Sequence, residues 1–181
     1  YDTATGNPRW SGASGGVSYS SPHPVEIDGV RQVVQLGGDG ATSVEPSTGV
    51  VLWRHGFGGG AIVQPAVTAN GDVLINSISF TGGQGIRRLA VARASGAWRA
   101  DERWTSTGLK PYFNDFVVHD GHAFGFDGSI LSCIDLADGA RKWKGGRYGS
   151  GQLVLLADQG VLLVLSHEGE LALVRGSPVG V

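Results

Sequence analysis

A short tryptophan-ended motif recurs along the chain and limits the possible folds more than any other feature. The segments TGNPRW, TGVVLW, SGAWRADERW and DGARKW end at Trp10, Trp53, Trp104 and Trp143. Successive tryptophans are 43, 51 and 39 residues apart. A period of about 40 to 50 residues is that of one four-stranded blade in a β-propeller. The sequence therefore predicts a repeat architecture in which each unit is one small sheet.

Turn signals divide each unit into four short segments. In the unit that ends at Trp53, the segments cover residues 23–27, 30–36, 41–45 and 50–54. Turns such as Asp28-Gly29 separate them, and Asp-Gly pairs supply the positive φ that tight hairpins need. The segments are rich in β-branched and aromatic residues, and no helical periodicity competes with them. We expect an all-β chain, a β-propeller of four-stranded antiparallel blades.

The motif also divides the chain, which we treat as one propeller segment over residues 1–181. We expect the end of one blade over residues 1–11, closing with a strand at 7–11, whole blades over 12–54, 55–105 and 106–144, and an incomplete blade over 145–181. The unit ending at Trp104 is the longest, and its extra residues, 81–85 and 95–101, are expected in loops. About four blades are few for a propeller, so we expect a partial ring, unless the amino-terminal strand completes the last blade.

Composition excludes several classes of protein. Because 41% of the residues are hydrophobic and only 17% are charged, the chain is not of the disordered type. A net charge of −2 offers no basic surface for nucleic acid. The longest apolar stretches, 153–157 and 161–165, are too short to cross a bilayer. The single cysteine, Cys133, allows no intrachain disulfide and is expected in the core. We expect neither nucleic-acid binding nor membrane insertion.

An Asp, then Thr-Gly, then a blade-closing Trp form a family pattern, present here as YDTATGNPRW and IDLADGARKW, with SVEPSTGVVLW as a variant. In these motifs the whole chain resembles bacterial quinoprotein-like β-propellers that carry pyrroloquinoline-quinone (PQQ) repeats. The resemblance implies tryptophan docking, in which each indole packs between adjacent blades and its N–H finds a backbone partner. It also implies a location outside the cytoplasm, in the periplasm.

Polar residues recur just before the first strand of each unit. Alignment of the units places these residues at matching positions: Ser20 and Ser21, Gln64, Asn114 and Asp115, Ser150 and Gln152. The first strand of a propeller blade lines the central channel, so we expect these side chains at one channel mouth, a concave geometry that ligand sites favour. The alternative is that they hydrate the channel or tie neighbouring strands together.

The loop KGGRYGSGQ, residues 144–152, is a second candidate for ligand binding. Arg147 presents a bidentate fork beside Tyr148, and the glycines allow close approach of a carboxylate or phosphate. An ordinary crossover between blades is the alternative. The loop lacks the ending of a phosphate-binding P-loop, and the glycine run at 56–60 lies in no nucleotide-binding unit.

Two functions compete. The first is a noncatalytic propeller, a binding or scaffold module for a protein or a small ligand, with no cofactor expected. PQQ-like repeats also build a periplasmic lipoprotein that assists outer-membrane barrel assembly, so the resemblance includes that role. The alternative is a fragment of a quinoprotein dehydrogenase that oxidises alcohols or sugars with PQQ and calcium. For the alcohol-oxidising members the resemblance implies a paired-cysteine cover over the quinone, which Cys133 alone cannot form.

Further expectations concern metal, burial and self-association. His119 and His122 flank a hairpin turn, but no Cys or other His is close in sequence, so no metal site is expected. The indoles of Trp10, Trp53 and Trp143 are expected to be largely buried. Open flanks on the first and last blades predict that the isolated chain pairs or aggregates.

Overall fold

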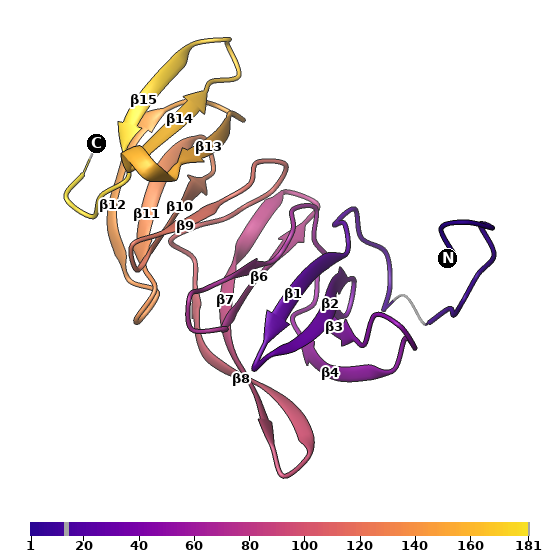
Figure 1. Ribbon diagram of the computed structural model, residues 1–181. Helices are drawn as coiled ribbons and strands as arrows, with labels where there is room; N and C mark the ends of the chain where they lie inside the picture. Colours follow the sequence, from indigo (N-terminus) through magenta and orange to yellow (C-terminus); the bar gives the residue numbers. More distant parts are fainter. Residues whose placement is uncertain (13–14, 181) are drawn as a thin grey trace.

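Four antiparallel sheets follow one another along the chain and form a curved row (Figure 1). The computed structural model describes residues 1–12 and 15–180. Within that part of the chain, the helical content is one 3-10 turn, η1 (Ala157–Gln159). The strands, in chain order, are β1 (His23–Ile27), β2 (Val30–Gly37), β3 (Gly40–Val44), β4 (Val51–Gly56), β5 (Ala66–Val67), β6 (Val73–Ser79), β7 (Gly82–Ala94), β8 (Ala97–Ser106), β9 (Val117–His119), β10 (His122–Asp127), β11 (Ile130–Asp135), β12 (Arg141–Arg147), β13 (Gln152–Leu156), β14 (Val161–Leu165) and β15 (Leu171–Arg175).

Each sheet is a meander in which consecutive strands pair, with β1 to β4, β5 to β8, β9 to β12 and β13 to β15 as the four sheets. In the first sheet the strands begin and end within two residues of the positions that the turn signals predict. Asp28 and Gly29 have φ values of 49° and 71°, as the tight hairpin turn requires. The expected fold class is confirmed: an all-β chain of antiparallel sheets in a propeller arrangement.

Apolar side chains fill the spaces between neighbouring sheets. Val34 and Leu36 of the first sheet pack with Val73 and Ile75 of the second, and comparable clusters join the second sheet to the third and the third to the fourth. Complete burial of such a side chain contributes about 1.5 to 3 kcal/mol. The sheet-to-sheet contacts therefore stabilise the row, and they fix the loops at the ends of the strands.

The second sheet differs from the sequence prediction. Residues 81–85 and 95–101 were expected in loops, but most of them extend one long hairpin of β7, with 13 residues, and β8, with 10 residues. The prediction was wrong because the two segments continue a regular ladder, in which Val91 pairs with Ala100 and Arg93 with Trp98. Trp98 packs against the cluster between the first two sheets.

Three of the four motif tryptophans lie against the next sheet along the chain. In each case the indole Nε1 donates to a backbone carbonyl oxygen in the segment that follows the third strand of that sheet. The three bonds are Trp10 to Pro46 at 2.9 Å, Trp104 to Leu136 at 2.9 Å and Trp143 to Ser177 at 2.8 Å. Trp53 is different. Its indole is buried and donates to Oε1 of Gln32 in its own sheet at 2.9 Å, because the long β7–β8 hairpin places no such segment beside it.

The amino-terminal segment corrects two expectations. Residues 1–12 contain no strand, so the closing strand predicted at 7–11 is absent, and the indole of Trp10 is 38% exposed rather than buried. The reason is that no described strand lies beside the segment to form a ladder with it. The segment is held instead by Trp10, which lies directly over Gly49, where an added Cβ would come within 2.4 Å of the ring.

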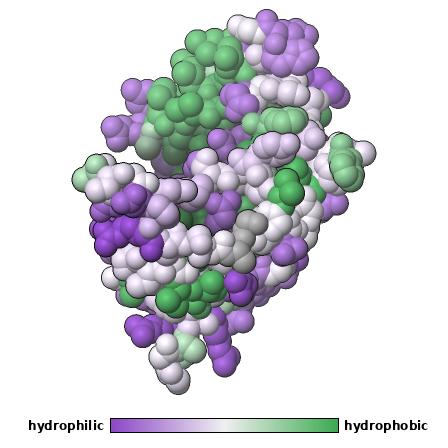
Figure 2. Space-filling model, turned by 90° about the vertical axis from the view of Figure 1, so that its right-hand side faces the viewer, coloured by the Kyte–Doolittle hydropathy of each residue, from purple (hydrophilic) through white to green (hydrophobic). Residues whose placement is uncertain are grey.

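The fourth sheet leaves one face open. The amino-terminal segment contacts the first sheet, at the opposite end of the row, and does not complete the fourth sheet (Figure 1). Figure 2 shows a broad apolar region at the top of the molecule, at the level that the fourth sheet occupies in Figure 1. The exposed apolar side chains of this sheet are Val154, Leu165, Leu171 and Leu173. The row is therefore a partial ring.

Candidate functional site

One face of the row gathers the loops that cross from each sheet to the next and the turns between second and third strands. We call it the crossover face. Backbone hydrogen bonds join its loops: Gly59 N donates to Gly38 O at 3.3 Å, and Tyr148 N donates to Ser129 O at 3.1 Å. The loops are thus fixed to one another. The hollows described below lie on this face.

The larger hollow on the crossover face is an apolar groove of about 1090 Å³. Apolar side chains line it from the segment before the first sheet, from β6 and the turn after it, and from the crossovers into the second and third sheets: Val17, Tyr19, Ile62, Ile78, Phe80, Tyr112 and Phe113. Tyr19, Phe80 and Phe113 are exposed, with Phe80 fully so. We call this hollow the aromatic groove. Exposed aromatic side chains around a hollow are typical of a surface that binds another molecule.

A glycine crossover shapes the floor of the aromatic groove. Gly59 has a φ of 112°, and a Cβ there would lie 2.3 Å from the carbonyl oxygen of Ile78. Ile78 N donates to Gly60 O at 3.2 Å, so the loop is hydrogen-bonded to the second sheet. On the other side, Tyr19 N donates to Ala61 O at 3.0 Å. Only glycine at 59 permits this close approach of two backbones.

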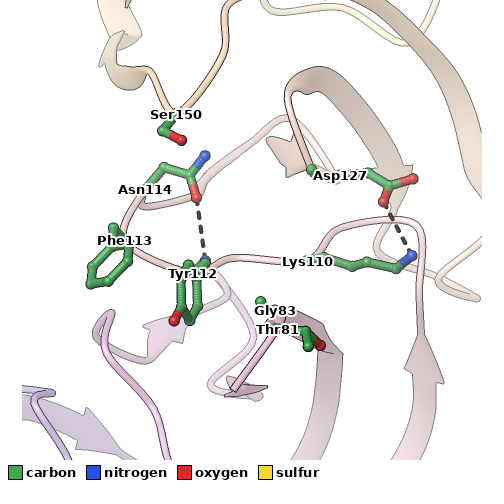
Figure 3. A pocket seen from close by; sticks show the side chains of 10 residues that line it. Thr81, Gly83, Lys110, Tyr112, Phe113, Asn114, Asp127 and Ser150 are labelled. Carbon is green, nitrogen blue, oxygen red and sulfur yellow. Dashed lines mark hydrogen bonds and ion pairs between the residues drawn. The ribbon is translucent and has the colours of Figure 1, made fainter. Parts of the chain in front are cut away.

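The smaller hollow is a polar cavity of about 380 Å³ on the far side of Tyr112 and Phe113 (Figure 3). Polar side chains that line it include Thr81, Lys110, Asn114, Asp127 and Ser150. Asn114 Oδ1 accepts a hydrogen bond from Tyr112 N at 3.2 Å. Figure 3 shows the ends of the Asn114 and Ser150 side chains close together at one side of this cavity.

Three cationic side chains contact the carboxylate of Asp127, at the end of β10. Its Oδ2 accepts from Arg141 at 2.7 Å and from Lys144 at 2.6 Å, and Lys110 Nζ lies 3.2 Å from its Oδ1. Burial raises the pKa of Asp127, but hydrogen bonds from Lys144 and Lys110 outweigh it and hold that pKa below its ordinary value. The carboxylate is therefore ionised, and three cations surround one anion.

The structure brings part of the predicted channel mouth together. Asn114 and Ser150 line the polar cavity, and Gln152 Nε2 donates to Phe113 O at 3.1 Å beside it. Gln64 Oε1 pairs with Nδ1 of His23 on the preceding sheet at 3.1 Å. Gln64 and Gln152 thus tie neighbouring sheets, as the alternative interpretation from sequence held.

Other predicted residues lie elsewhere or have structural partners. Ser20 is buried, and its carbonyl oxygen accepts from Gln35 Nε2 at 3.0 Å. Ser21 is exposed next to it and lines neither hollow. Asp115 also lines neither hollow, although partial desolvation raises the pKa of its carboxyl. These residues add no donor or acceptor to the polar cavity.

Arg147 and Tyr148 line a separate hollow of about 380 Å³ with Ser129, His167 and Glu168. The structure therefore does not join this predicted site to Asn114 and Ser150. The bond from Tyr148 to the neighbouring turn is that of a crossover between sheets. The two sequence candidates are distinct places on the molecule.

The aromatic residues of the groove and Lys110 were not predicted from the sequence. Tyr19, Tyr112 and Phe113 immediately precede polar residues that were selected, and Phe80 stands in a turn next to a glycine pair. A large aromatic residue in a turn, where turn chemistry favours small polar residues, was the available signal. Lys110 carried no local signal, because its partner Asp127 belongs to the next hairpin.

Residues 1–12 and 15–180 contain no group of three His, Cys, Asp or Glu side chains that could hold a metal ion. They likewise include no helix with the length and apolar character needed to span a bilayer. Cys133 is buried, and burial raises the pKa of its thiol to about 12.

Comparisons with known proteins agree with this architecture. A family model described as outer membrane protein assembly factor BamB matches residues 1–176. No match was found among curated protein sequences. Similar solved structures include the β-propeller domain of Cps50 (Swd1) from Myceliophteria thermophila, with a TM-score of 0.62, 12% identity, and 81% of this chain and 47% of that chain covered.

Two more structures share the fold. The computationally designed Ika4 protein has a TM-score of 0.58 and 13% identity, with 88% of this chain and 90% of that chain covered. BamB from Moraxella catarrhalis has a TM-score of 0.51 and 15% identity, with 92% and 54% covered. At these identities the likeness shows the fold alone. The chain spans about half the length of the Cps50 and BamB chains.

Proposed function

The chain belongs to the PQQ-repeat β-propeller family described as outer membrane protein assembly factor BamB, and from that premise we propose that it is a noncatalytic module that binds a protein partner during outer-membrane protein assembly. The family description alone supports the assembly role and a periplasmic location. The binding surface is proposed from the molecule itself, because fold does not determine function.

The exposed aromatic residues of the groove are the main support for this proposal. Tyr19, Phe80 and Phe113 expose aromatic side chains to solvent around one hollow. Tyrosine and phenylalanine supply large contact area at low entropic cost and are enriched at protein interfaces. The loops beneath them are hydrogen-bonded to neighbouring sheets, so a partner would meet a preformed surface.

The partner class follows from the family's description. Strands of outer-membrane barrels alternate apolar and polar residues and carry aromatic girdles. In an extended, unfolded segment of such a protein, aromatic side chains are free to enter a groove lined by aromatic rings. No arrangement of the described residues favours the quinoprotein dehydrogenase over this role, and we propose no catalytic step.

Fluorescence anisotropy with a labelled, urea-unfolded outer-membrane barrel protein, diluted into buffer, tests the proposal. Phe80→Ser and Phe113→Ser are expected to weaken binding about tenfold or more, the loss typical of a central aromatic contact. Val50→Ser is the matched control, because Val50 is an exposed apolar residue just before β4 and lies outside the groove. Unchanged binding in both phenylalanine variants would overturn the proposal, as would alcohol-dependent dye reduction after addition of PQQ and calcium.

A further inference from the structure

We propose that the polar cavity on the crossover face binds an oxyanion, a carboxylate or phosphate group, through Lys110, Asn114 and Ser150. This site is separate from the aromatic groove, with Tyr112 and Phe113 forming the wall between them. Its recognition chemistry is that of a charge-assisted hydrogen bond from lysine supported by neutral donors.

The excess of positive charge beside the cavity favours an anionic ligand. Arg141, Lys144 and Lys110 all pair with the single carboxylate of Asp127, and no other acidic side chain among the described residues forms an ion pair with any of them. One negative charge therefore faces three positive charges. An additional anion is attracted to such a place, and more strongly in a partly enclosed cavity than on an open surface.

The arrangement leaves Lys110 available. Arg141 and Lys144 share Oδ2 of Asp127 at 2.7 and 2.6 Å, whereas Lys110 alone approaches Oδ1, at the longer distance of 3.2 Å. Of these three cations, Lys110 alone lines the cavity. Its flexible side chain can turn its ammonium to a ligand while Asp127 keeps two cationic partners.

Asn114 supplies the second argument. Its side chain is 5% exposed and lines the cavity. Its Oδ1 is occupied by Tyr112 N, so the amide orientation is fixed, and its Nδ2 has no hydrogen-bond partner among the described residues. This N–H group is accessible from the cavity rather than sealed in the core, so an anionic oxygen there can accept a hydrogen bond from it. The hydroxyl of Ser150 is a third donor at the same cavity.

Two-dimensional NMR of the ¹⁵N-labelled chain tests the site, with inorganic phosphate and acetate titrated separately at constant ionic strength. We expect a saturable shift of the Asn114 side-chain amide and of the backbone amides around Lys110 and Ser150. Whichever anion binds more tightly identifies the source of the oxyanion. Lys110→Met is expected to weaken binding at least tenfold, the loss of one charge-assisted contact.

Control variants separate loss of the anion site from general effects of charge and from misfolding. Lys142→Met removes an exposed lysine of β12, the strand that also carries Lys144. Lys142 pairs with Asp135 outside the cavity, so this variant should leave binding unchanged. Asn114→Ala and Ser150→Ala should each weaken binding, and an unchanged thermal midpoint of Ser150→Ala shows that folding is not the cause. Shifts that do not saturate, or Lys110→Met binding like the native chain, would overturn the proposal. The aromatic groove is tested separately, because unfolded barrel protein should still bind to Lys110→Met.

Discussion

Single side chains stabilise the turns of this chain in a repeated way. Asp2 Oδ1 accepts from Thr5 N at 3.0 Å, and Asp135 Oδ1 accepts from Ala137 N at 2.8 Å. Glu45 performs the same task with a longer side chain and accepts from Ser47 N at 3.0 Å. These bonds explain why an acidic residue opens the tryptophan-ended motif. The carboxylate satisfies backbone N–H groups that the turn leaves without partners.

The carboxyl of Glu45 is expected to make the stability of its turn depend on pH. Hydrogen bonds from Thr48 and Ser47 lower its pKa from the ordinary 4.5 to about 2. A depressed pKa means that the stabilisation is fully present above pH 4.5 and is lost as the pH falls toward 2. NMR titration of the Glu45 carboxyl should place its midpoint near 2, and Glu45→Gln should remove this part of the acid sensitivity. An ordinary midpoint for Glu45 would show that the turn is not formed as described.

The tryptophans differ in burial, and their replacement should differ in its effect on stability. Trp53 is 4% exposed and bonded to Gln32, whereas Trp10 is 38% exposed. Trp53→Ala should lower the free energy of unfolding by about 3 to 5 kcal/mol, because it leaves a cavity between two sheets. Trp10→Ala should cost only about 1 kcal/mol, since surface changes are small. Urea denaturation of both variants measures the difference, and equal losses would contradict it.

The loops and turns between strands are positioned by close contacts between backbone segments. The crossover before the second sheet passes over Ile78 at Gly59, and the long β7–β8 hairpin replaces the turn that would otherwise meet Trp53. Strand positions were predictable because turn residues and alternating apolar residues mark them. The hairpin length was not, since a polar, arginine-rich segment can continue a ladder when its partner strand is equally long.

Gly59 allows a matched test of the crossover. In Gly59→Ala the new Cβ would meet the carbonyl oxygen of Ile78 at 2.3 Å, in a backbone conformation with φ of 112° that alanine rarely adopts. The free energy of unfolding should fall by about 1 to 3 kcal/mol, and binding at the aromatic groove should weaken. Gly58→Ala is the control, because no atom lies within 4 Å of its added Cβ. Denaturation curves that coincide for the two variants would contradict the described loop.

For the whole molecule, the open face of the fourth sheet is the dominant feature. Phe126 and Leu131 pair across the third sheet and are completely buried by the fourth, whereas Leu165 and Leu171, the corresponding pair of the fourth sheet, are 47% and 64% exposed. The repeat made this open end predictable. The candidate site was less predictable from the sequence. Asn114 was selected from its place in the repeat, but the aromatic groove and Lys110 depend on contacts between sheets that the spacing of residues does not reveal.

Exposure of that face predicts self-association of the isolated chain. An apolar sheet face of this kind is unfavourable in water and pairs with any matching surface. Sedimentation velocity should show concentration-dependent association, and Leu171→Lys with Leu173→Lys should shift the chain toward monomer. Val50→Lys, at an exposed position just before β4, is the control and should have no such effect. A compact monomer that binds no hydrophobic dye would be the opposite result.

Binding through the crossover face can be measured most directly by hydrogen exchange of the native chain with and without unfolded outer-membrane barrel protein. The predicted result is slower exchange in the segments that form the aromatic groove, residues 17–19, 58–62, 78–84 and 112–113. The turns at the opposite ends of the strands, such as Asp28-Gly29 and Asp120-Gly121, should exchange as before. Protection confined to those opposite turns, or to the open face of the fourth sheet, would contradict the proposed binding surface.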